Sequence, residues 1–182
     1  MISNEQHADA LAAASAARDA ILHEQERRKG GRFATIFPDE GPYRREVYPK
    51  HMAFIAAGAT YKERLFMKAN RVGGTRLGAF EVTCHLTGRY PSWWNGRRFT
   101  EPIQGWACGT TSETTRDIVQ AELLGPIDGT SGAYQVGTGM LPPESIVHTT
   151  RRPHGLPGSV ESIWVRHATG GMSVLGLKQY EQ

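Results

Sequence analysis

The sequence predicts an α/β fold in which strands and helices alternate along the chain. Three patterns predict it: a short apolar run that passes through glycines into a helical period over 65–88, a strand followed by a helix over 103–125, and two β-rich runs over 160–178. Together they indicate a sheet with helices packed against it and a β-hairpin at its C-terminal end.

The first pattern begins with Leu65 to Lys68, which we expect to form a central strand of the sheet. Gly73 and Gly74 follow, and apolar side chains then recur at helical spacing from Thr75 to Leu86. The period changes from strand to helix across the glycines, which predicts a strand, a tight turn and a helix behind the sheet.

A long helix is expected at the N-terminus, because residues 4–29 are rich in Ala, Glu, Gln and Arg. Prolines, glycines and charges over 32–47 mark a connecting segment. We therefore divide the chain into a helix and linker over 1–47 and a main domain over 48–182. The main domain opens with a helix that starts at Pro49 and ends at Gly58, where we expect a left-handed residue.

The second strand is expected over 103–108. The helix after it begins near Thr110, whose spacing to Glu113 fits a capping box, and ends at Gly125. The β-rich runs of 160–178 are joined by glycines, which predicts a hairpin.

Composition narrows the class of protein. The chain has 182 residues, 39% hydrophobic and 21% charged, with 21 glycines and 10 prolines, as expected of one loop-rich globular domain. No apolar run approaches the roughly 20 residues that cross a bilayer, so we expect no membrane partner and a cytoplasmic location. Cys84 and Cys108 lack the spacing of a metal site, and we expect both to be buried apolar groups.

The residues that indicate chemistry run from Lys68 to Thr75. A strand that enters a helix through glycines directs backbone N–H groups and the positive end of the helix dipole at one point, where phosphate binds. The usual phosphate loop reads G-x-x-x-x-G-K-[ST], whereas here Lys68 holds the first glycine position and Gly74 the lysine position. The Lys68 side chain is long enough to fold back over the loop, and Thr75 opens the helix as a magnesium ligand would. On spacing alone, a glycine turn without a ligand is an equal alternative.

A second candidate is the stretch 34–40. An apolar strand that ends in two carboxylates, here Asp39 and Glu40, is how phosphate-loop ATPases supply a magnesium ligand and a base. Pro38 and the position of the pair ahead of the loop argue against this assignment.

Three segments resemble the ATPase end of tailed-phage terminase large subunits, the motors that pump DNA into capsids. They are Lys68–Thr75, His85–Phe99 with its Tyr-Pro-Ser-Trp-Trp-Asn-Gly sequence, and Thr115–Gln120. The resemblance spans roughly 48–182. Some members of this family carry the working lysine at the front of the loop, where Lys68 stands here.

The resemblance implies an incomplete P-loop NTPase-like core of the ASCE type, with ATP and Mg²⁺ as cofactors. Lys68 would contact phosphate, Thr75 would bind magnesium through the nucleotide, and Gly73 and Gly74 would form the backbone cradle. Arg71 would contact phosphate or a transition-state charge, although a surface arginine explains it as well. The implied binding residues for the phosphates are Lys68, Ala69, Asn70, Arg71, Val72, Gly73, Gly74 and Thr75. The implied adenine contacts lie near 48–51, with Tyr48, Pro49 and Lys50 as the candidates, although a helix start packed on the domain explains this stretch equally well.

The implied function is the nucleotide-binding part of a viral DNA-packaging motor, which drives DNA into the capsid by ATP hydrolysis. The implied partners are double-stranded DNA, the portal, the small terminase subunit and other large subunits in a ring. The implied location is the cytoplasm of the bacterial host and, transiently, the procapsid portal. The family continues into an acidic strand, a coupling motif and a nuclease domain, with no counterpart before Gln182. We therefore expect this chain to bind ATP but to hydrolyse it barely above background, without a catalytic residue of its own.

Two other classes of function are open from the sequence. The chain could be a non-catalytic assembly module, in which the helix over 4–29 docks a partner and the glycine loop is structural. It could also be a basic DNA-binding protein without nucleotide, given its arginine pairs, its four tryptophans and its net charge of +3.

Overall fold

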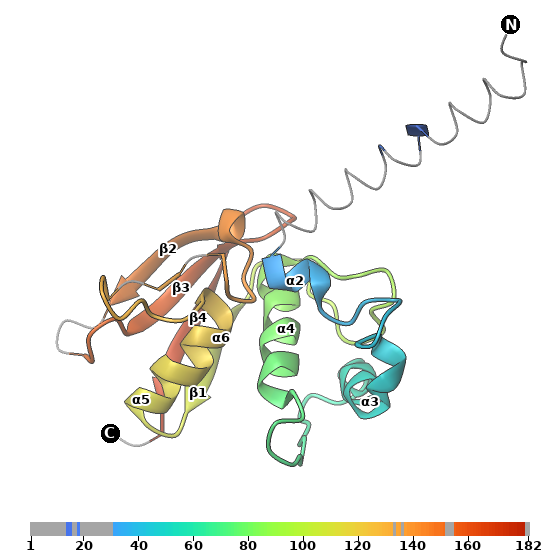
Figure 1. Cartoon of the computed structure of the whole chain (residues 1–182), viewed down its shortest axis with the longest axis horizontal. Coiled ribbons are helices and arrows are strands. Elements are labelled where there is room, and N and C mark those ends of the chain that lie inside the picture. Colours follow the sequence, from blue (N-terminus) through green and yellow to red (C-terminus); the bar gives the residue numbers. More distant parts are fainter. Residues whose placement is uncertain are drawn as a thin grey trace, which may run out of the picture.

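The computed structural model of the protein describes residues 14–15, 18, 31–132, 134–135, 137–151 and 155–180. Over these residues the fold is mixed α/β, with a four-stranded sheet in the order β1-β4-β3-β2 (Figure 1). The strands are β1 (Gln104–Gly109), β2 (Ile146–Arg151), β3 (Val160–Arg166) and β4 (Met172–Gln179). Within the described ranges, no helix is long and apolar enough to cross a membrane.

The pairing of the sheet is mixed. Strand β1 runs parallel to β4, with Trp106 opposite Gly176, whereas β3 is antiparallel to both β4 and β2. The predicted strand over 103–108 and the predicted C-terminal hairpin are therefore confirmed as β1 and β3–β4. Strand β2 was not predicted. It is led by the short 3-10 turn η3 (Pro143–Ser145).

The helix α4 (Gly74–Thr87) lies between the sheet and the helix α3 (Pro49–Ala57), as Figure 1 shows. Its predicted span is confirmed, and Gly88 ends it in the left-handed region with a φ of 67°. Gly58 follows α3 but is right-handed, with a φ of −63°, so the left-handed expectation was wrong there. Glycine leaves room here for the Arg64 side chain, because a Cβ atom would lie 2.9 Å from its Nη1.

The helical stretch after β1 consists of α5 (Ser112–Thr114), a π-helical turn η2 (Thr115–Gln120) and α6 (Ala121–Leu124). It ends at Gly125, as predicted. Its cap is Thr111 rather than Thr110, because the Thr111 hydroxyl accepts the Thr114 N–H at 3.2 Å.

The predicted strand Leu65–Lys68 is wrong. This segment is extended but pairs with no strand, and Leu65 and Met67 are 82% and 85% exposed. Of these four side chains only that of Phe66 turns inward, where it contacts the rings of His51 and Phe54. A short apolar run forms a strand only where a neighbouring strand pairs with its backbone, and none of the described strands lies beside this segment.

The segment expected to be a connection contains α2 (Gly31–Thr35) and the 3-10 turn η1 (Arg45–Val47). Phe37 is buried with its ring 5.5 Å from that of Phe80 on α4, so the segment contributes to the core. The residues before Asp39 and Glu40 are helical and bent, not a strand. The helix expected over 4–29 lies outside the described residues, apart from residues 14, 15 and 18.

The core lies between the sheet and α4, where Ile163, Val165, Leu175 and Leu177 are buried. On the opposite sheet face Trp106 is 77% exposed. Cys84 is buried on α4. Its burial raises the pKa of its thiol, and the nearby charge of Glu81 raises it further. Cys108 is exposed, so the expectation that both cysteines are buried was wrong for the second one.

Candidate functional site

An open cavity of about 880 Å³ lies between the segment 32–51 and the loop that precedes α4. Cavities of roughly 300–1,000 Å³ are typical of small-molecule sites. Its walls come from α2, η1, the first turn of α3 and residues 66–73, so distant parts of the sequence meet in it.

Cationic side chains gather around this cavity. The described residues that line it include five cations and no carboxylate, which favours an anionic ligand; these cations are Arg32, Lys50, Lys68, Arg71 and Arg76.

The loop that enters α4 turns through two left-handed residues. Arg71 has a φ of 63° and Gly73 a φ of 81°. The first backbone bond into the helix runs from the Leu77 N–H to the Gly73 carbonyl at 2.9 Å. The N–H groups of Gly73 and of residues 74–76 therefore have no acceptor among the described residues. Such a helix start attracts anions through its free N–H groups and its dipole.

Lys68 lies across this helix start. A Cβ atom on Gly74 would overlap Cδ and Cε of Lys68 and lie 3.1 Å from its Nζ, so the absence of a side chain at Gly74 leaves room for the lysine. The side chain thus folds back over the loop, as the sequence suggested. No acidic residue stands in the first turn of α4, and a cation is unfavourable beside the positive end of a helix dipole. An anion between the ammonium and the N–H groups would interact favourably with both.

The apolar wall of the cavity is largely aromatic. His51 on α3 is buried, with its ring 5.4 Å from Tyr48 and 5.3 Å from Phe66. Phe37 packs edge-on against Tyr48 at 5.8 Å. The wall offers ring faces and edges beside the cations, an arrangement that suits a flat aromatic group linked to phosphates.

A carboxylate outside the cavity holds two of its cations. Oε1 of Glu122, on α6, lies 3.2 Å from Nε of Arg76 and 3.4 Å from Nη1 of Arg32. The helix after β1 is thereby linked to the cavity through α4 and α2. No group of three or more His, Cys, Asp or Glu side chains that could hold a metal ion occurs in the part of the chain that the structure describes.

The structure brings most of the predicted binding residues to this cavity. Of the loop, all but Asn70, Gly74 and Thr75 line it, and so do the predicted adenine contacts Tyr48, Pro49 and Lys50. His51, which also lines the cavity, stands at the end of the stretch 48–51 where the resemblance placed the adenine contacts. Sequence reasoning missed several other lining residues, which are Arg32, Phe37, Phe66 and Arg76. Arg76 adjoins the motif and could have been included, whereas the others reach the cavity only through the fold.

A buried ion pair links α4 to the segment that follows α3. Oε1 of Glu81 lies 2.8 Å from Nη2 of Arg64 and 3.6 Å from Nε2 of His85. Burial raises the pKa of the Glu81 carboxyl, but hydrogen bonds from His85 and Arg64 outweigh it and leave the pKa below its usual range. Nη1 of Arg64 also donates to the Phe54 carbonyl at 2.7 Å, which ties α3 to α4.

The tryptophan-rich segment that resembles terminases packs against His85, which belongs to this ion-pair cluster. The Tyr90 hydroxyl lies 3.1 Å from Nδ1 of His85 and accepts the Phe99 N–H at 2.8 Å. Arg97 lies over the Phe99 ring and Arg98 over the Tyr90 ring, at 5.2 and 5.1 Å. Both arginines thus have aromatic partners within the chain.

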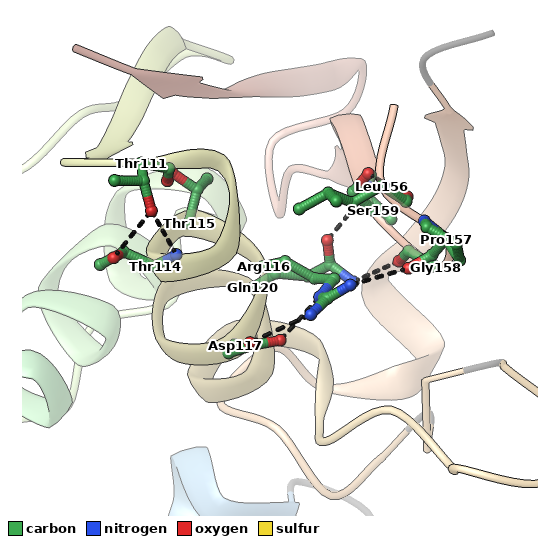
Figure 2. Close-up of polar contacts among 11 residues, drawn as sticks. Thr111, Thr114, Thr115, Arg116, Asp117, Gln120, Leu156, Pro157, Gly158 and Ser159 are labelled. Carbon is green, nitrogen blue, oxygen red and sulfur yellow. Dashed lines mark hydrogen bonds and ion pairs between the residues drawn. The ribbon is translucent and has the colours of Figure 1, made fainter. Parts of the chain in front are cut away.

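The Thr115–Gln120 segment forms hydrogen bonds with the loop before β3 (Figure 2). The Gln120 amide donates to the Gly158 carbonyl at 2.8 Å, and its oxygen accepts the Val160 N–H at 2.8 Å. Arg116 donates to the Pro157 carbonyl at 3.3 Å and pairs with Asp117. The segment fastens the helix after β1 to strand β3.

Comparison with known proteins identifies the family of this chain. Residues 65–182 match the family described as terminase large subunit, T4-like virus type, N-terminal. The terminase large subunit of Salmonella phage P22 is 36% identical over 152 residues, which cover 74% of this chain but only 30% of that protein. No solved structure matches. The chain thus spans under a third of the P22 protein's length, and it belongs to the terminase large-subunit family.

Proposed function

We propose that the cavity binds ATP, with the triphosphate over the start of α4. The observation that carries the proposal is Lys68, which lies across a helix start whose N–H groups have no acceptor among the described residues. Bound phosphate would accept from Gly73 and the first turn of α4 and would stand beside the Lys68 ammonium. The surrounding cations and the aromatic wall support the same ligand.

Within this proposal each group has a separate task. Lys68 and Arg71 neutralise phosphate charge, and Tyr48, Pro49 and Lys50 form the side where adenine would lie. Thr75, the second residue of α4, would offer its hydroxyl to Mg²⁺, which prefers oxygen ligands. No carboxylate is among the described lining residues, so phosphate oxygens and waters would supply the other ligands of the ion.

At the level of the whole protein, we propose that the chain is the nucleotide-binding part of a DNA-packaging motor. Membership of the terminase large-subunit family supports this function. Its partners would be double-stranded DNA, the portal, the small subunit and further large subunits in a ring. It would work in the cytoplasm of the bacterial host, at the procapsid portal.

Calorimetric titration with MgATP tests the binding proposal. Lys68→Ala should weaken binding by about ten- to a hundredfold, because a charge-assisted bond to phosphate in the cavity is lost. Arg97→Ala is the matched control, since Arg97 stacks on Phe99 outside the cavity, and it should bind within about twofold of the unmodified chain. Equal losses of MgATP affinity in the two variants would mean that Lys68 acts only as a general surface charge. A parent chain that binds no nucleotide would instead favour the assembly module.

A further inference from the structure

His51 is the buried polar group closest to the loop that enters α4. It is 7% exposed and is enclosed by the rings of Phe37, Tyr48 and Phe66. Its Nε2 lies 3.0 Å from the carbonyl oxygen of Val72. A carbonyl can only accept, so Nε2 carries the hydrogen and donates it. His51 therefore connects the helix α3 to the backbone of the loop.

This bond fixes the orientation of one peptide plane. Val72 contributes the carbonyl and Gly73 the N–H of the same planar peptide group, and in a trans peptide these two point to opposite sides. With the Val72 carbonyl held toward His51, the Gly73 N–H faces the other way and has no acceptor among the described residues. A flip of this peptide would exchange a donor for an acceptor at the place where phosphate is proposed to bind.

The flanking backbone makes such a flip accessible. Arg71 and Gly73, on either side of Val72, both have positive φ values, and a non-glycine residue at φ 63° is strained. Val72 itself is 41% exposed, so packing of its side chain does not hold the loop. The bond from His51 is the polar side-chain contact that holds this peptide.

We propose that His51 is a positioning residue for the phosphate loop, which holds the Val72 carbonyl so that the Gly73 N–H is presented to the anion. The inference rests on the proposed nucleotide site. His51 touches the loop rather than the ligand's reacting atoms, so its effect passes through the loop backbone.

Two substitutions separate the hydrogen bond from the packing. His51→Phe keeps a ring among the aromatic side chains but removes the donor, whereas His51→Gln replaces the ring with an amide that can donate from a similar position. His148→Phe changes an exposed histidine on β2 and serves as the control. Folding of each variant is checked by circular dichroism, and MgATP affinity is measured by calorimetric titration.

We expect His51→Phe to weaken MgATP binding about tenfold and His51→Gln to remain within about threefold of the parent chain. Trypsin gives an independent readout, because cleavage after Arg71 should accelerate in His51→Phe but not in His51→Gln, with cleavage after Arg97 as the internal reference. Equal affinity of His51→Phe and the parent chain overturns this inference alone. A parent chain that binds no MgATP overturns the proposed function and this inference with it.

Discussion

Glu81 is charged although it is only 6% exposed, because contacts with neighbouring side chains replace the hydration that the carboxylate loses on burial. Arg64 and His85 both contact its Oε1 atom, and the same arginine lies 4.4 Å from the centre of the Phe54 ring. A buried carboxylate without such partners would be protonated or would unfold the site. The charge of Glu81 therefore contributes to the way α3 and α4 are held together beneath the cavity.

The pKa of Glu81 predicts an acid-sensitive stability. Because its folded-state pKa lies below the unfolded value of about 4.3, its contribution is present above that value and is lost as pH falls through the folded pKa. Glu81→Gln should lower the free energy of unfolding by about 2 kcal/mol at pH 7 and flatten its fall below pH 5. Urea denaturation at pH 7 and pH 4 measures both effects, with exposed Glu63→Gln as the control. An unchanged pH dependence in Glu81→Gln would contradict the assignment.

At the scale of elements, the helix after β1 is fixed to the sheet by several side chains of its π-helical turn, among them Gln120. Gln120 is 1% exposed and uses both halves of its amide on the backbone that leads into β3. Thr115, one turn earlier, donates to carbonyls of Thr111 and Lys178, which adds a link to β4. The π-helical turn that contains both residues thus links the helix after β1 to β4 and to the backbone that leads into β3.

Removal of the Gln120 amide should loosen this junction. In Gln120→Leu the Val160 N–H and the Gly158 carbonyl lose their partners while the volume is nearly kept, which should cost about 2–4 kcal/mol of stability. Amide hydrogen exchange at Val160 should rise together with the loss of stability, measured by NMR and urea denaturation. Gln135→Leu, at an exposed position, should change neither. Retained protection at Val160 in Gln120→Leu would mean that another group accepts that hydrogen.

The elements that the sequence predicts well are those whose signals are local. Glycines and apolar spacing define α4, and the alternating runs on either side of Gly170 define β3 and β4. Leu65–Lys68 is a short, mostly apolar run that lacks a neighbouring strand, which no local pattern reveals. Likewise the motif identifies Lys68, whereas Arg32 and Phe37 join the cavity from positions that only tertiary packing brings near it.

At the scale of the molecule, the described lining of the cavity suits nucleotide binding better than nucleotide hydrolysis. Its described lining has charges that neutralise phosphate but no carboxylate that could orient an attacking water. Groups that bind the ground state and the transition state equally do not accelerate the chemical step. Asp39, from the candidate acidic pair, is instead paired with Arg45 at the surface.

We therefore expect this chain to hydrolyse ATP barely above background even where it binds nucleotide, since a missing positioning group costs a factor of roughly a hundred or more. A steady-state assay with Mg²⁺ and ATP measures this, with Lys68→Ala as the baseline. A second polypeptide that supplies an acidic strand should restore turnover. Strong turnover that Asp39→Ala or Glu40→Ala abolishes would instead assign catalysis to that pair.

The parallel pairing of β1 with β4 also sets an order for folding during synthesis. Val174 stands opposite Gln104 but follows it by 70 positions, and β4 lies between β1 and β3 although it comes after both in the chain. Before β4 leaves the ribosome, β1 has no partner, and β2 and β3 form only a two-stranded hairpin, which is marginally stable by itself. The aromatic contacts between Phe37, Phe80 and Trp93 join segments made earlier. The nascent chain can thus assemble the cavity side first, whereas the sheet must wait for its central strand and closes late.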